Sequence, residues 1–273
     1  MYMIRVKFIT PKKPYTTYVN GNLVNILQQR LEALGAIKIV ESSPEIVHIF
    51  GLWTIRNANN IQKYRDIGVP VVFTSIEGLS PLLSRSGNVT KDLSKKIAIK
   101  SICKKSTVVH TCGPSESCII SKLSRKLSVV EIQNVELTAL TTEEKMANLF
   151  MEMYKNSYTT NDNLIKQAID NKVKKDVTNN TIADICSRLM YIRNRFTSGC
   201  IRQSILDDTA RILTESNYDE DEMSKALDRL GMLEFSAYCM KLLESTTGLT
   251  EGFMPIDAKS GKTVKRMQNM IVQ

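Results

Sequence analysis

Six short apolar runs divide the first half of the chain, and single stretches of helical character separate most of them. The runs lie at residues 4–10, 36–40, 46–50, 69–74, 107–111 and 128–132. Several are apolar almost throughout, which is typical of strands buried on both faces of a parallel sheet. Parallel strands need crossover connections, and the intervening helices supply them. The pattern predicts an α/β fold with a Rossmann-like, doubly wound parallel sheet over residues 1–140.

The second half has a different periodicity. From Met146 to Tyr154, apolar residues recur at the spacing of an amphipathic helix. Further helical stretches lie at about 162–173, 180–196, 202–215, 220–230 and 232–245. The chain shows no strand pattern after residue 136. We therefore expect residues 141–273 to form an all-α helical region.

Charge is distributed unevenly between the halves. Residues 1–140 hold 19 Lys and Arg against 9 Asp and Glu, while residues 141–273 hold 18 against 19. A basic half suits nucleic acid, an anionic membrane or a phosphorylated ligand, or is simply a solvated surface. Nucleic acid is not expected, since basic residues and aromatics do not interleave and no nucleic-acid motif occurs.

Lysines gather at two places in this basic half. Lys12 and Lys13 follow the first strand, and four more lie on the helix predicted over 91–103, in which Leu93, Ile97 and Ile102 are expected to face inward. The four are Lys91, Lys95, Lys96 and Lys100. Such a face suits an anionic lipid surface or a lipid-pyrophosphate acceptor. The alternative is a solvated helix face.

Signals for export, metals and common cofactors are missing from the sequence. No apolar run approaches the ~18 residues of a membrane span, and the opening residues lack the apolar stretch of a signal peptide. The six cysteines form no CxxC pair and no zinc spacing. Neither GxGxxG nor GxxxxGK[ST] follows the first strand. We expect a cytoplasmic protein with reduced thiols, no metal and no cofactor, in peripheral contact at most with the inner membrane face.

Ligands of parallel sheets bind beyond the carboxyl ends of the strands. His48 and His110 lie near such ends, where each is either a hydrogen-bonded core histidine or part of an acceptor site. Trp53, the only tryptophan, lies just beyond one strand. It is either an exposed platform on which a sugar stacks or a partly buried side chain.

One carboxylate lies in a long loop at the same edge. Glu77 precedes Gly78 within the stretch 75–88, and loops of that length are often functional. As a general base, Glu77 would accept the proton of an acceptor hydroxyl. The alternative is a solvated loop carboxylate.

Several segments resemble one enzyme family in their order and spacing. The stretch Pro44-Glu45-Ile46-Val47-His48-Ile49-Phe50-Gly51-Leu52-Trp53 is similar to a strand with the pattern Pro-Asp-Val-Val-His-Val-His-Gly-Leu. Residues 68–74, 107–112 and 130–135 resemble the strands that follow. Together, residues 1–136 resemble the N-terminal, acceptor-side domain of GT-B glycosyltransferases of the family-four type.

The resemblance implies hexosyl transfer from a nucleotide-sugar to a polysaccharide or lipid-linked acceptor. The family's usual Thr-Pro-His-Gly reads Thr74-Ser75-Ile76-Glu77-Gly78 here, so the family's histidine is absent. From its place in the loop, Glu77 is the expected catalytic residue. The expected substrate contacts are His48, Gly51, Trp53, Gly78, His110, Asn134, Lys12 and Lys13. The family's donor-binding second domain has no counterpart here, so a nucleotide-sugar-binding protein partner is expected. Residues 141–158 resemble the helix by which such chains return to their first domain, and are expected to pack on it. The alternative function is a non-catalytic binding or scaffold protein of a glycan-assembly pathway.

Overall fold

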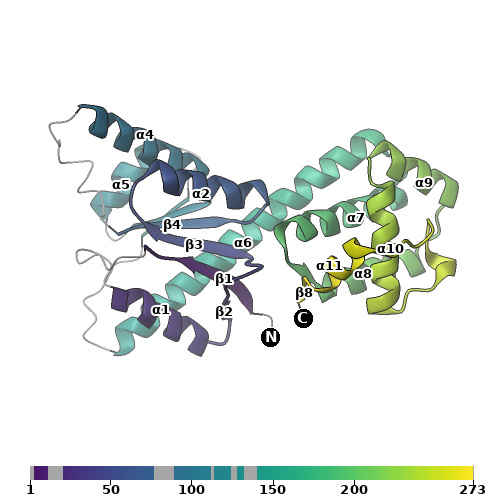
Figure 1. Cartoon of the computed structure of the whole chain (residues 1–273), viewed down its shortest axis with the longest axis horizontal. Coiled ribbons are helices and arrows are strands. Elements are labelled where there is room, and N and C mark those ends of the chain that lie inside the picture. The colour runs from purple at the N-terminus through teal and green to yellow at the C-terminus, as the bar shows by residue number, and fades with distance from the viewer. Residues whose placement is uncertain are drawn as a thin grey trace. The chain divides into compact units, whose positions relative to one another are not determined.

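The computed structural model describes residues 3–11, 21–76, 89–111, 114–123, 128–131 and 140–272 (Figure 1). The chain divides into two compact units, Met1–Asn161 and Asp162–Gln273. Helix α6 (Leu140–Asp176) contributes its first part to the first unit and its remainder to the second. The predicted boundary at residue 140 thus falls at the start of this helix.

The first unit is built on a six-stranded parallel sheet with the order β2-β1-β3-β4-β5-β6 (Figure 1). The strands are β1 (Ile4–Ile9), β2 (Ile37–Ile39), β3 (Ile46–Gly51), β4 (Val71–Ser75), β5 (Val108–Thr111) and β6 (Ser128–Glu131). The neighbouring strands β3 and β4 are buried along their whole length. Their continuous apolar character follows from that burial. The α/β class and the six predicted strands are confirmed.

Helices cover both faces of the sheet. Because side chains alternate along a strand, the neighbours Ile49 and Phe50 of β3 enter different cores. The core containing Phe50 is covered by α1 (Gly21–Ala33) and the first part of α6. The core containing Ile49 is covered by α2 (Ile55–Asp66), α4 (Val89–Lys105) and α5 (Pro114–Leu123). Figure 1 shows α1 on one side of the strands and α2, α4 and α5 on the other.

The sequence predicted only part of the face with which helix α4 packs on the sheet. Ile102 is buried as expected, together with Ile99 and Cys103. Leu93 and Ile97 are 57% and 52% exposed, so the prediction that they face inward is wrong. A helix with apolar residues on more than one side has no unique inner face in its sequence.

The first part of α6 is a layer of the first unit. Phe150, Met153 and Tyr154 are buried in the core that also holds Phe50. At the start of the helix, Arg30 of α1 pairs with Glu143 at 2.7 Å. Near the end of this part, the Asn161 side chain donates to the Gly68 carbonyl at 2.9 Å.

The second unit consists mainly of helices. Besides the rest of α6, it contains α7 (Asn180–Ser198), α8 (Gln203–Glu215), α9 (Glu220–Arg229), α10 (Leu233–Thr247), the 3-10 turn η1 (Glu251–Phe253) and α11 (Lys262–Gln268). The prediction of no strand after residue 136 is wrong, because β7 (Ile201–Arg202) and β8 (Ile271–Val272) pair in parallel. Although α6 has 37 residues, none of the helices in the described ranges has an apolar stretch sufficient to cross a bilayer.

We predict that Phe150→Ala destabilises the first unit by about 3–5 kcal/mol, because it empties a buried site between helix and sheet. The measurement is urea unfolding followed by the fluorescence of Trp53, the only tryptophan, which lies in this unit. Leu149→Ala is the matched control, since Leu149 is 48% exposed on the same helix. Its effect should stay within about 0.5 kcal/mol. Equal effects of the two variants would contradict this assignment of α6.

Candidate functional site

The sheet has a topological switch point at β1, where the order in which successive strands are added reverses direction. Strand β2 lies on one side of β1 and β3 on the other. At such a point the connections that follow β1 and β3 run to opposite faces of the sheet. This leaves a crevice beyond the carboxyl ends of these two strands. A pocket of about 520 Å³ lies there. Its lining comes from the ends of β1 and β3 and from the start of α2: Ile9, Thr10, Pro11, Ile49, Phe50, Gly51, Leu52, Thr54, Arg56, Asn57 and Asn60.

The turn from β3 into α2 shapes one wall of this pocket. Thr54 caps α2, its hydroxyl accepting from the Asn57 amide N–H at 3.2 Å. The Asn57 side chain donates to the Leu52 carbonyl at 2.8 Å, which holds the turn closed. A Cβ atom on Gly51 would lie 2.4 Å from the Asn57 Nδ2. Gly51, a predicted acceptor contact, therefore lines the pocket, and its lack of a side chain lets the Asn57 amide approach.

Part of the pocket lining is polar and cationic. Arg56 is exposed in the first turn of α2, where no acidic residue occurs. The amino end of a helix carries partial positive charge, which adds to that of the guanidinium. Thr10 and Asn60 add a hydroxyl and an amide. The arrangement suits a ligand with hydroxyl or anionic groups.

The two histidines, His48 and His110, lie elsewhere, in a buried network of hydrogen-bonded side chains beneath α6. His48 is fully buried, with its Nδ1 2.6 Å from the Tyr154 hydroxyl and its Nε2 2.7 Å from the Thr74 hydroxyl. The Thr74 hydroxyl is also 2.9 Å from Nδ1 of His110, which is buried as well. The predicted acceptor contacts of His48 and His110 are therefore wrong in this structure. The alternative, hydrogen-bonded core histidines, is confirmed.

Burial keeps His48 and Tyr154 uncharged in this network. Burial, and secondarily the neighbouring His110, hold the pKa of His48 well below its ordinary value of 6.5. Burial also raises the pKa of Tyr154 well above 10.0. The Phe50 ring stacks on His48 with centroids 3.9 Å apart, and Phe150 contacts the His110 ring at 4.8 Å. This network joins α6 to three strands, and neither His48 nor His110 is among the residues that line the pocket.

Trp53 is also part of the core. Its side chain is 4% exposed and packs on Phe73 with ring centroids 4.9 Å apart. No ring face is left for a sugar, so the predicted stacking platform is wrong. Five other predicted site residues lie outside the described residues: Lys12, Lys13, Glu77, Gly78 and Asn134.

Sequence reasoning missed the polar side chains of α2. Arg56, Asn57 and Asn60 follow Thr54, which lies directly after a predicted strand. Thr54 is a residue type that commonly caps the start of a helix, and its hydroxyl accepts from the backbone N–H of Asn57, three residues later. This cap lies at the carboxyl edge of the sheet. That signal identifies the start of α2 as a place from which side chains reach a ligand.

We predict that the first unit loses stability as the pH falls below 6.5. The folded state keeps His48 neutral, whereas the unfolded state binds a proton there with the ordinary pKa of 6.5. Stability is thus complete above that pH and decreases by up to about 1.4 kcal/mol per pH unit below it. Unfolding midpoints followed by Trp53 fluorescence from about pH 7.5 to about pH 5.5 measure the slope. His48→Gln should flatten it, and identical slopes in the two proteins would contradict the role of His48.

Comparison with known proteins adds no functional assignment. No protein-family model matches the chain, and a search of curated proteins finds no match to it.

Proposed function

We propose that the chain is a glycosyltransferase-like protein whose first unit binds a glycan acceptor at the carboxyl edge of the sheet. The observation that carries the proposal is the pocket between the ends of β1 and β3. In doubly wound sheets of the order 2-1-3-4-5, the ligand binds at this switch point. The observed order extends that scheme by one strand and supports a Rossmann-like interpretation.

The resemblance to GT-B N-terminal domains supports the same site. The segment from Pro44 to Trp53 carries part of that resemblance, and it supplies β3 and one wall of the pocket. The first part of α6 packs on the sheet as a returning helix would. Both features agree with an acceptor-side unit whose donor-binding counterpart is a separate chain.

The pocket chemistry suits a sugar acceptor. Thr10, Thr54 and Asn60 offer groups that both donate and accept hydrogen bonds, as sugar hydroxyls do. Arg56 offers a planar fork to a hydroxyl pair, a phosphate or a carboxylate. Glu77 remains the proposed general base. Ile76, the residue before it in the sequence, donates its backbone N–H to the carbonyl of the pocket residue Gly51 at 3.0 Å.

A specific observation favours the second candidate, a non-catalytic glycan-binding or scaffold protein. The described residues that line the pocket include no carboxylate and no imidazole. If Glu77 does not serve as the base, the pocket binds without catalysing transfer. Measuring transfer as well as binding separates the two candidates.

We predict that an acceptor oligosaccharide stabilises the isolated chain, whereas UDP-, GDP- and CMP-sugars alone do not. At a ligand concentration 100-fold above Kd the gain is about 2.7 kcal/mol. Arg56→Gln should weaken binding about tenfold, since it removes a charge-assisted contact. Lys63→Gln is the matched control, because Lys63 is exposed on the same helix and does not line the pocket.

The outcomes separate the candidates. Glycan binding followed by transfer when a donor-binding protein is added supports the transferase. Binding without transfer under the same conditions supports the scaffold. If no acceptor glycan stabilises the wild-type chain, both are wrong.

We also propose that α4 contacts an anionic membrane surface. Leu93 and Ile97 lie one turn apart and are exposed, with the exposed Lys96 and Lys100 beside them. Exposed aliphatics next to lysines suit insertion among lipids with anionic headgroups. The expected localisation is therefore cytoplasmic, with peripheral contact at the inner membrane face.

We predict that the chain sediments with vesicles of phosphatidylcholine and phosphatidylglycerol, and much less with phosphatidylcholine alone. The double variant Lys96→Gln, Lys100→Gln should lose about 2 kcal/mol of binding, at about 1 kcal/mol per lysine, or roughly 30-fold in affinity. Lys63→Gln serves again as the control for charge alone. Equal binding to both kinds of vesicle would contradict the proposal.

A further inference from the structure

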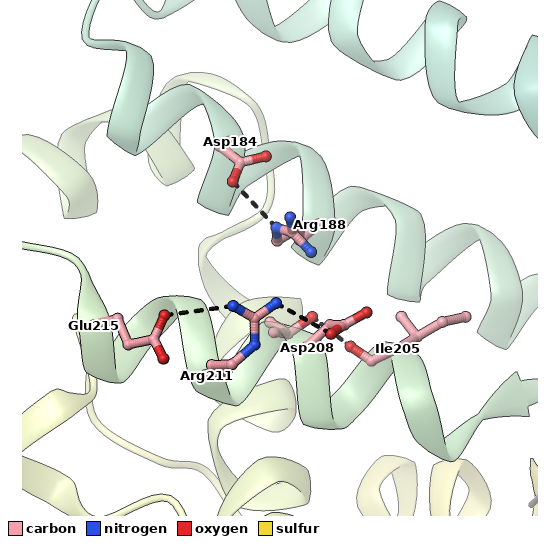
Figure 2. Close-up of polar contacts among 7 residues, drawn as sticks. Asp184, Arg188, Ile205, Asp208, Arg211 and Glu215 are labelled. Atoms are coloured by element: carbon pink, nitrogen blue, oxygen red, sulfur yellow. Dashed lines mark hydrogen bonds and ion pairs between the residues drawn. The ribbon is translucent and has the colours of Figure 1, made fainter.

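The second unit holds a cavity of about 290 Å³ between α6, α7 and α8. It is distinct from the pocket of the first unit and belongs to none of the predicted sites. The polar groups that matter for its chemistry are Lys166, Asp170, Ser187, Arg188, Tyr191 and Asp208. Figure 2 shows Arg188 on the side of α7 that faces α8, with Asp208 and Arg211 on α8 opposite.

Tyr191 is a fixed part of the cavity lining. Its side chain is 8% exposed, and its hydroxyl donates to the Asp162 carboxylate. The same carboxylate pairs with Arg195 at 2.6 Å and with Lys166 at 3.0 Å. Both cations lie near the Tyr191 ring, at 4.9 and 5.1 Å from its centroid. This network holds the ring in place before any ligand arrives.

The charges of the walls are largely paired within the protein. Arg188 pairs through its Nε with Asp184 at 3.2 Å. Asp208 pairs through its Oδ1 with Arg211 at 3.3 Å, and Arg211 also pairs with Glu215 at 3.4 Å (Figure 2). A strongly charged ligand would have to compete with these pairs for its own counter-charge. A neutral ligand would not.

The same groups keep hydrogen-bonding capacity to spare. In the part of the chain that the structure describes, Arg188 uses only its Nε and Asp208 only its Oδ1. Within the described ranges, the Ser187 hydroxyl and the Asp170 carboxylate have no hydrogen-bond or ion-pair partner, and both residues are half-buried. The cavity lining therefore offers both donors and acceptors to a ligand.

We infer that this cavity binds a neutral polyhydroxylated ligand, a saccharide with one ring in the cavity. Sugar hydroxyls both donate and accept hydrogen bonds, which matches a cavity lined by the Arg188 guanidinium and by the Asp170 and Asp208 carboxylates. Ile169 and Ile205 offer apolar contact to the C–H face of a ring. A volume near the lower end of ligand pockets fits a single ring. The inference rests on the second unit alone and does not depend on the proposed function of the sheet.

The test is saturation-transfer NMR on the full chain with glucose, galactose, mannose and N-acetylglucosamine, and with lysine and glutamate as charged probes. We expect at least one neutral sugar to bind. Arg188→Lys keeps the charge but loses the planar fork, and should weaken binding about tenfold or more. Arg193→Lys is the matched control, because Arg193 lies on the same helix outside the cavity.

Asp170→Asn gives a second readout that does not require a large structural change. Its amide oxygen still accepts, so a neutral sugar should lose only a few-fold in affinity. The inference is overturned if no neutral sugar binds, if Arg188→Lys leaves binding unchanged, or if only charged probes bind. Sugar binding that disappears in Arg56→Gln and persists in Arg188→Lys also overturns it, because that binding would belong to the first unit.

Discussion

The first unit depends on a chain of hydrogen bonds that crosses its core. Tyr154 on α6, His48 on β3, Thr74 on β4 and His110 on β5 are linked through hydroxyl and imidazole groups. Buried polar groups are costly unless they are paired, so each member requires the next. The Thr74 hydroxyl has a single hydrogen, so it donates to one imidazole and accepts from the other. This requirement fixes α6 against the sheet more specifically than apolar packing alone.

That arrangement leaves the carboxyl edge of the sheet available for a ligand. With the histidines and Trp53 in the core, the pocket is formed by the ends of β1 and β3 and by the first turns of α2. Apart from Thr10, the polar side chains of the site thus come from the N-cap and first turns of α2. The second unit builds its cavity differently, from charged side chains on three helices that neutralise one another.

The sequence predicted the sheet well and the site poorly, for physical reasons. Buried parallel strands are apolar throughout, and that pattern is visible without any tertiary information. The inner face of α4 was not predicted fully, because Leu93 and Ile97 are as apolar as the buried Ile99. Strands β7 and β8 have two residues each, too few to show alternation. The buried environment of His48 depends on a hydrogen bond with Tyr154, which lies 106 residues away in the sequence. No local sequence pattern predicts such a contact.

The close approach at Gly51 has a consequence for how this chain can vary. A Cβ atom there and the Asn57 amide would occupy the same space, and that amide holds the turn after β3 closed. Positions 51 and 57 are therefore coupled. Among homologues, a residue larger than glycine at position 51 should occur only together with a smaller one at position 57, so the two positions should covary.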